Sequence, residues 1–298
     1  MGDYGPAPSP TATALPDGVP AIPTVTEDIS VLVTGFGPFK THNVNSSWLV
    51  ASSLPSTLVL PGKASSVTPE GGPAARRISI YTHPSPVPVS YSAVRSTVPE
   101  IVDEYARVHD GRRPDLIIHI GLASTRNYWS VETLARRDDY RMGDVDGKVG
   151  YESGEKIWKE QGLPPVLRPG PVDGRGLSSP ATTMSTVVAP AVTPTAPLVA
   201  PVSRVSPYPV DDHFLEVWKS FAPAGSDIRI SHDAGRYLCE FIFYTSLAQA
   251  LQEGRNRSVV FFHVPSWHDE ANIKIGTEIA VALIKALVIC WIDERRQA

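Results

Sequence analysis

Three residues whose side chains can together carry out nucleophilic catalysis are spread along the chain. Cys239 follows the segment HDAGRYL and stands where an apolar helical pattern begins. At the first turn of a helix, unpaired backbone N–H groups and the positive end of the helix dipole stabilise a thiolate or a developing oxyanion. A cysteine nucleophile also needs an imidazole and a group that orients it. His263, which ends the run SVVFFH, and Glu132, which follows the run PDLIIHIGL, are the candidates.

Each of these residues also has an ordinary structural explanation. A cysteine in an apolar helix usually packs in the core, as Cys290 in ALVICWI is expected to do. A histidine at the end of a buried strand is usually a hydrogen-bonded core residue, and a lone glutamate is usually solvated. The spacing of the three residues alone therefore leaves both interpretations open.

The segments that must position these residues alternate between strand and helix patterns. Apolar, β-branched runs typical of buried strands are followed by helical patterns, the first of which, SSWLVASSL, is expected to start with a serine cap. This alternation predicts a three-layer α/β/α sandwich with a mainly parallel, twisted central sheet. Ligands bind beyond the carboxyl ends of the strands in such sheets. We therefore expect four segments to meet at one rim: TGFGPF, GLASTRNYWSVE, HDAGRYLC and HVPSWHDE.

Proline content divides the chain. Residues 1–28 lack an apolar period and are predicted to be a disordered tail, and residues 29–298 are predicted to form one domain. A second Pro-rich stretch, at about 163–209, is predicted to be a disordered insertion in that domain, because repeated proline prevents helices and removes strand donors.

Composition excludes several classes of function. The net charge of -4 offers no basic field for nucleic acid, and two cysteines in 298 residues cannot form a disulfide framework. No export signal and no apolar run of about 18 residues is recognised, so we expect a soluble, cytoplasmic protein without a membrane partner. GFGPFK lacks the glycine spacing of nucleotide-binding loops, and no metal-ligand motif accompanies His263 and His268. We therefore expect no cofactor and no metal.

From residue 31 onward, the sequence resembles pyroglutamyl peptidase I, the family of pyrrolidone-carboxylate cysteine peptidases, and its eukaryotic branch more than its bacterial one. The resemblance is carried by VLVTGFGPFKTHNVNSSW, PDLIIHIGLA with VETLARRDDY after it, SHDAGRYLCEFIFYTSL, and FFHVP. It implies a phosphorylase/hydrolase-like sandwich in which Cys239, His263 and Glu132 form the family's catalytic triad. It also implies a cysteine exopeptidase that removes N-terminal pyroglutamate from peptides, acts without a cofactor and is a monomer.

The resemblance also implies a pocket for the uncharged lactam ring. Such a pocket must combine apolar faces with a few hydrogen bonds. The residues that the family's pattern assigns to substrate binding are Phe36 and Phe39 on the faces of the ring, Asn45 near its polar edge, Leu122 through its backbone, Tyr237 and Leu238 closing the pocket, and Arg141 beside the oxyanion.

The sequence also departs from the family's pattern. The bacterial glutamine at the end of the third strand is Leu122, and the AGGR after it is ASTR. The bacterial setting ERVAIN of the glutamate is ETLARR, and Lys40 replaces a glycine beside the pocket. These departures keep two alternatives open. One is a catalytically inactive binding protein on the same scaffold, with the Pro-rich insertion as a docking segment. The other is a phosphorylase-type enzyme that shares the sandwich.

Overall fold

A seven-stranded sheet forms the centre of the molecule. The structure is a computed structural model that describes residues 25–40, 42–61, 75–171 and 210–293. The strands stand in the order β2-β3-β1-β4-β9-β5-β8. Their bounds are β1 Val25–Gly35, β2 Thr57–Pro61, β3 Ala75–Thr82, β4 Leu116–Leu122, β5 Trp129–Glu132, β8 Ile228–Ser231 and β9 Val259–Val264. A separate two-stranded sheet pairs β6 (Ala135–Arg136) with β7 (Val166–Leu167).

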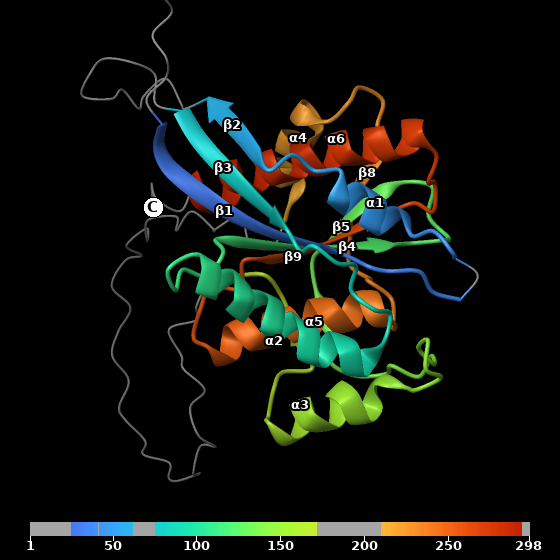
Figure 1. Cartoon of the computed structure of the whole chain (residues 1–298). Helices are drawn as coiled ribbons and strands as arrows, with labels where there is room; N and C mark the ends of the chain where they lie inside the picture. The colour runs from blue at the N-terminus through green and yellow to red at the C-terminus, as the bar shows by residue number, and fades with distance from the viewer. Residues whose placement is uncertain (1–24, 41, 62–74, 172–209, 294–298) are drawn as a thin grey trace, which may run out of the picture.

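Helices cover both faces of this sheet (Figure 1). One face packs against α1 (Ser46–Ser52), α4 (Asp212–Phe221) and α6 (Glu270–Leu287), which continues as the π-helical turn η2 (Val288–Asp293). The other face packs against α2 (Tyr91–Val108), α5 (Leu238–Gln252) and α3 (Lys156–Glu160), which follows the π-helical turn η1 (Tyr151–Glu155). These three layers confirm the predicted α/β/α sandwich.

The sequence explains why α5 lies deepest. Eleven of its residues are buried, because the helix is apolar on most of its circumference and fits between the sheet and the helices α2 and α3. Its first residue follows Tyr237, whose extended backbone (φ -139°) ends the preceding loop. Gly235 in that loop has a φ of +82°, a left-handed conformation that glycine adopts without cost.

The direction of two strands differs from the expectation. β1, β3, β4 and β9 run parallel to one another, but β5 is antiparallel to β9, and β8 is parallel to β5. The carboxyl ends of β5 and β8 therefore point away from those of β4 and β9. The four segments expected at one rim do not all follow strands that end there. The side chains of β5 and β9 instead meet on the face of the sheet that α5 covers.

The last helix is apolar enough, by length and composition alone, to cross a membrane. This segment, Glu270–Ile292, contains Lys274, Glu278 and Lys285, so it is not the uninterrupted apolar run that the sequence was expected to lack. In the structure, 67% of an apolar 18-residue window within the segment is buried, and α6 packs against α1 and α4.

The boundaries of the two Pro-rich segments also shift. Strand β1 begins at Val25, within the predicted tail. Residues 163–171 belong to the fold, since Leu163 is buried, β7 pairs with β6, and Gly170 bridges to Arg257. Residues 1–24 and 172–209, which carry the rest of the predicted tail and insertion, lie outside the described residues.

Candidate active site

Glu132 and His263 are joined by a hydrogen bond across neighbouring strands. The ladder places Ser130 opposite His263 and Glu132 opposite Phe261, so Glu132 reaches His263 diagonally on the same face of the sheet. The distance from His263 Nδ1 to Glu132 Oε1 is 2.7 Å, and the glutamate side chain is fully buried. This is the arrangement in which a carboxylate orients an imidazole.

Burial and the mutual contact set the charge of this pair. Burial alone would raise the pKa of Glu132, but the hydrogen bond and charge of His263 and the charge of Arg126 lower it to about 2. Burial lowers the pKa of His263, against the opposing effect of Glu132. At neutral pH the pair is therefore a carboxylate and a neutral imidazole. The Nδ1–H donates to Glu132, and Nε2 is left as the basic nitrogen.

Cys239 Sγ packs against Gly121, whose ladder partner on the next strand is His263. A Cβ atom added to Gly121 would lie 2.9 Å from Cys239 Sγ and 2.4 Å from Phe261 Cζ. Gly121 pairs with His263 in the ladder between β4 and β9, and paired residues of parallel strands face the same side of the sheet. The missing side chain of Gly121 thus provides the space in which the thiol approaches the strand that carries His263.

The thiol is protonated in the resting site. Among the described residues, no hydrogen bond joins Cys239 Sγ to a ring nitrogen of His263. Burial, followed by the negative charge of Glu132, raises the pKa of the Cys239 thiol to about 12, although Arg126 acts in the opposite direction. The helix terminus was expected to stabilise a thiolate, whereas burial and the charge of Glu132 favour the protonated thiol in the resting site.

The start of α5 offers donors for an oxyanion. The side chain of Tyr237 does not cap the helix, and the first-turn N–H groups of any α-helix lack intrahelical partners. Cys239 is the second residue of α5, so its own N–H is one of these donors. Backbone donors in this position stabilise a negative oxygen that develops beside the sulfur.

Aromatic side chains lie next to this helix start. The ring centroids of Phe39 and Tyr237 are 6.3 Å apart, and Tyr237 meets Tyr91 edge-on at 6.0 Å. Phe36 is buried in the same apolar cluster, as is Leu238. Among the residues predicted to hold the lactam, Phe39 and Tyr237 are thus in contact, while Phe36 and Leu238 pack in the core beside them.

Asn45 and Arg141 have other placements than predicted, and Leu122 can serve only through its backbone. Asn45 is buried and caps α1 in place of the predicted serine: its side chain accepts from the N–H of Ser47 at 3.1 Å and donates to Gly37 O at 2.8 Å. Leu122 alternates with Gly121 along β4, so its side chain faces the α1 and α6 side and only its backbone is available to the site. The side chain of Arg141 is 88% exposed and pairs with Asp139, so the structure does not bring it to Glu132 and His263.

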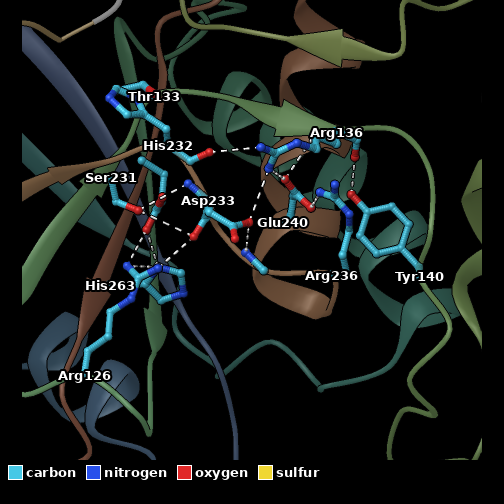
Figure 2. A network of polar contacts seen from close by, with 12 residues as sticks. Arg126, Thr133, Arg136, Tyr140, Ser231, His232, Asp233, Arg236, Glu240 and His263 are labelled. Atoms are coloured by element: carbon cyan, nitrogen blue, oxygen red, sulfur yellow. Dashed lines mark hydrogen bonds and ion pairs between the residues drawn. The ribbon is translucent and has the colours of Figure 1, made fainter.

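Arg126 was not among the predicted site residues. Its Nη1 donates to Glu132 Oε1 and to Ser130 Oγ, both at 2.6 Å, and its Nη2 donates to Asp233 O at 2.7 Å. Figure 2 shows its guanidinium group beside the ring of His263. The available signal was the arginine of ASTR after the third strand, which keeps the arginine of the bacterial AGGR.

A second buried carboxylate follows the cysteine in the chain. Glu240 is fully buried and accepts from Arg236 Nη1 at 2.6 Å and from the backbone N–H of Arg136 at 3.1 Å (Figure 2). Arg136 Nη1 lies 3.3 Å from the same carboxylate and 3.2 Å from Asp233. Arg136 is the first arginine of ETLARR. This departure therefore has a structural role, since it fixes the start of α5 to β6.

The site has the parts of a cysteine hydrolase on an α/β/α sandwich. These parts are a thiol at a helix start, an imidazole held by a carboxylate, and backbone donors in the first turn of the helix. Named relatives are peptidases, which agrees with a hydrolase site. The chain is 27% identical to pyroglutamyl-peptidase 1 of Mus musculus over 79% of this chain and 78% of that protein. It is 26% identical to pyroglutamyl-peptidase 1 of Homo sapiens, with the same coverage.

A solved structure shares the fold. A mutant pyrrolidone carboxyl peptidase from Pyrococcus furiosus aligns with a TM-score of 0.53 and 20% identity, over 89% of this chain and 99% of that chain. No protein-family model matches the chain. The named relatives, which align over most of the chain, confirm the resemblance to the pyroglutamyl peptidases.

Proposed function

We propose that this chain is a cysteine exopeptidase that removes N-terminal pyroglutamate from peptides, with Cys239 as nucleophile, His263 as proton carrier and Glu132 as its orienting carboxylate. The single observation that carries the proposal is the 2.7 Å hydrogen bond between His263 and Glu132, formed beside the thiol. His263 is the ladder partner of Gly121, and Cys239 Sγ packs against Gly121. Relatives named pyroglutamyl-peptidase 1 support the substrate class.

The acylation step follows from the resting charges. Because the thiol is protonated, Cys239 Sγ transfers its proton to Nε2 of His263 as it attacks the carbonyl carbon of the pyroglutamyl residue. Glu132 accepts from Nδ1 and stabilises the imidazolium that forms. The oxyanion accepts hydrogen bonds from the backbone N–H of Cys239 and its neighbour in the first turn of α5.

Collapse of this intermediate breaks the C–N bond. The Nε2–H of His263 protonates the departing amine, which leaves a thioester on Cys239. A water molecule then gives a proton to Nε2 and adds to the thioester carbonyl. Release of pyroglutamate returns the proton to sulfur, so the enzyme ends in its starting state.

Substrate selection rests on the aromatic contacts. Phe39 and Tyr237 offer apolar faces to a flat, uncharged ring, and the backbone of Leu122 supplies polar groups at the end of β4. The thiol peptidase is further proposed to be cytoplasmic and monomeric. Neither cysteine is in a disulfide, which suits a reducing compartment.

A fluorogenic pyroglutamyl amide tests the proposal. The wild type is expected to release the fluorophore and to form an acyl-enzyme, while Cys239→Ala is expected to be inactive and Cys290→Ala, at the buried second cysteine, fully active. A prolyl amide of the same fluorophore, whose ring lacks the lactam carbonyl, is the control for recognition of that carbonyl. Wild-type turnover no greater than that of Cys239→Ala would remove the proposal.

One observation favours the alternative of an inactive binding protein: among the described residues, the thiol has no hydrogen bond to His263. Slow alkylation by iodoacetamide does not separate the two functions, because a thiol with a pKa of about 12 reacts slowly in either case. Calorimetric titration with a pyroglutamyl peptide does separate them. A binding protein gives saturable heat with no free pyroglutamate, whereas the enzyme gives continuing heat of hydrolysis and the free acid.

A further inference from the structure

Arg126 contacts both halves of the candidate site. It lies in the connection between β4 and β5, and its side chain is only 17% exposed. Through Nη1 it binds the carboxylate of Glu132, and through Nη2 it binds the backbone oxygen of Asp233. Asp233 belongs to the loop that runs from β8 to Cys239, and its side chain accepts from the N–H of Gly235 at 3.2 Å. A single guanidinium thus bridges the strand pair that carries His263 and the loop that carries the thiol.

We propose that Arg126 is a positioning residue of this site, which fixes the Cys239 loop to the His263–Glu132 pair and tunes the basicity of His263. The inference rests on the proposed function for its kinetic consequences, but its structural part does not depend on turnover.

The geometry of Glu132 explains the tuning. Its Oε1 accepts from both His263 Nδ1 and Arg126 Nη1, while its Oε2 has no hydrogen-bond partner among the described residues. Arg126 Nη1 is also 3.3 Å from His263 Nδ1. Arg126 Nη1 and His263 Nδ1 both direct a hydrogen at the carboxylate, so no hydrogen bond joins them. The positive charge of Arg126 therefore repels the positive charge that His263 would carry as an imidazolium.

The remaining groups around the imidazole do not replace Arg126. The charged and titratable groups that face His263 are Glu132 from β5, Arg126 from the β4–β5 connection, and Asp233 and Cys239 from the loop and the start of α5. Arg126 is the only cation in this described set. Its removal leaves the negative charges of Glu132 and Asp233, so the imidazolium becomes more stable and the pKa of His263 rises.

Three substitutions in the full-length chain test the inference. Arg126→Gln removes the charge and keeps part of the hydrogen bonding, and Arg126→Lys keeps the charge without the two-pronged contact. Arg229→Gln is the matched control. Arg229 also lies against Tyr128 and also pairs with a carboxylate, but this carboxylate is Asp227, at 2.6 Å, and not Glu132. Urea unfolding of each variant verifies that it is folded.

The expected kinetic result is specific to positioning. Arg126→Gln lowers kcat by about 30-fold or more, leaves KM within about threefold of wild type, and moves the acid limb of kcat/KM to higher pH. Arg126→Lys keeps the acid limb near its wild-type position and recovers part of kcat. Arg229→Gln changes neither. A fall in kcat without any movement of the acid limb, or unchanged kinetics in Arg126→Gln, would overturn the inference.

A measurement without turnover separates this inference from the proposed function. The ring signals of His263 are titrated by NMR in wild type and Arg126→Gln, with His263→Gln used to assign them. A higher pKa in the variant supports the role of Arg126 even if the wild type proves inactive. An unchanged or lower pKa overturns the role even if the wild type is an active peptidase.

Discussion

Gly121 provides the sharpest test of where the thiol lies. Replacement by alanine adds one methyl group, and Gly121 has no positive φ that would strain the new residue. The added Cβ would stand 2.4 Å from Phe261 Cζ and 2.9 Å from Cys239 Sγ. Nonbonded carbon atoms favour separations of about 3.5 to 4.0 Å, so the ring must recede by about 1 Å or more and the sulfur by at least about 0.6 Å. The methyl group therefore pushes the nucleophile away from the strand that carries His263.

These displacements translate into two magnitudes. Overpacking of a filled core costs about 1 to 3 kcal/mol, so Gly121→Ala is expected to fold with a moderately lower free energy of unfolding. A misplacement of about 1 Å between reacting groups costs about 100-fold in rate, so kcat is expected to fall by about two orders of magnitude. The fall in kcat should therefore be much larger than the decrease in the folded fraction can explain.

The assay combines turnover of the pyroglutamyl amide with urea unfolding of the same preparations. Gly276→Ala is the matched control, because its Cβ would meet Val50 Cγ2 at 2.9 Å in the cluster on the opposite face of the sheet. The control is expected to change the free energy of unfolding and to keep kcat/KM within about threefold of wild type. If Gly121→Ala were as active as Gly276→Ala, the placement of the thiol against β4 would be refuted.

Three further predictions concern Glu132, His119 and Lys40. Glu132→Gln is expected to lower kcat by about 10²- to 10⁴-fold, because an amide no longer fixes the imidazole tautomer, and steady-state kinetics at several pH values check this. Burial lowers the pKa of His119 to about 3, so the unfolded chain binds the extra proton and stability on the order of 5 kcal/mol is lost as the pH falls from 6.5 to 3. His119→Gln, which can keep bonds to Thr34 and Ser246, should lose less in acid unfolding titrations; an equal loss would contradict the assignment. Lys40 has a φ of 48°, which costs a lysine about 1 to 2 kcal/mol, so Lys40→Gly should raise the free energy of unfolding by up to about 1 kcal/mol in urea titrations. Lys40 Nζ also stands 4.7 Å from the centroid of the Tyr237 ring, and a decrease of more than about 1 kcal/mol would show that this contact matters more.

The sequence was sufficient to predict the layers of the fold. The run LIIHIGL is buried at every residue of β4, as a central strand covered on both faces requires. The directions of β5 and β8 could not be predicted in the same way. Each has only four residues, and no local pattern distinguishes a parallel from an antiparallel partner. Direction is decided by the path of the connecting segments, which depends on the whole fold.

The candidate site was predictable to different degrees. Residue types that perform chemistry, such as Cys239 and His263, can be recognised because few side chains supply a nucleophile or a base. The partners of Arg126 could not be predicted, because a long side chain can reach many groups and only the tertiary structure selects Glu132 and Asp233. Asn45 could have been identified from its sequence, since an asparagine directly before SSWLV is a favoured N-cap.

The charges around Cys239 link these findings. Two buried carboxylates, Glu132 and Glu240, contribute to the high pKa of the thiol, and each of them is paired with an arginine. Burying a carboxylate without such a partner is strongly unfavourable, so Arg126 and Arg236 make the arrangement stable. Burial, followed by the negative charge of Glu132, keeps the nucleophile as a neutral thiol. Reactivity must then come from proton transfer to His263 during the attack, which ties the rate to the geometry that Gly121 and Arg126 maintain.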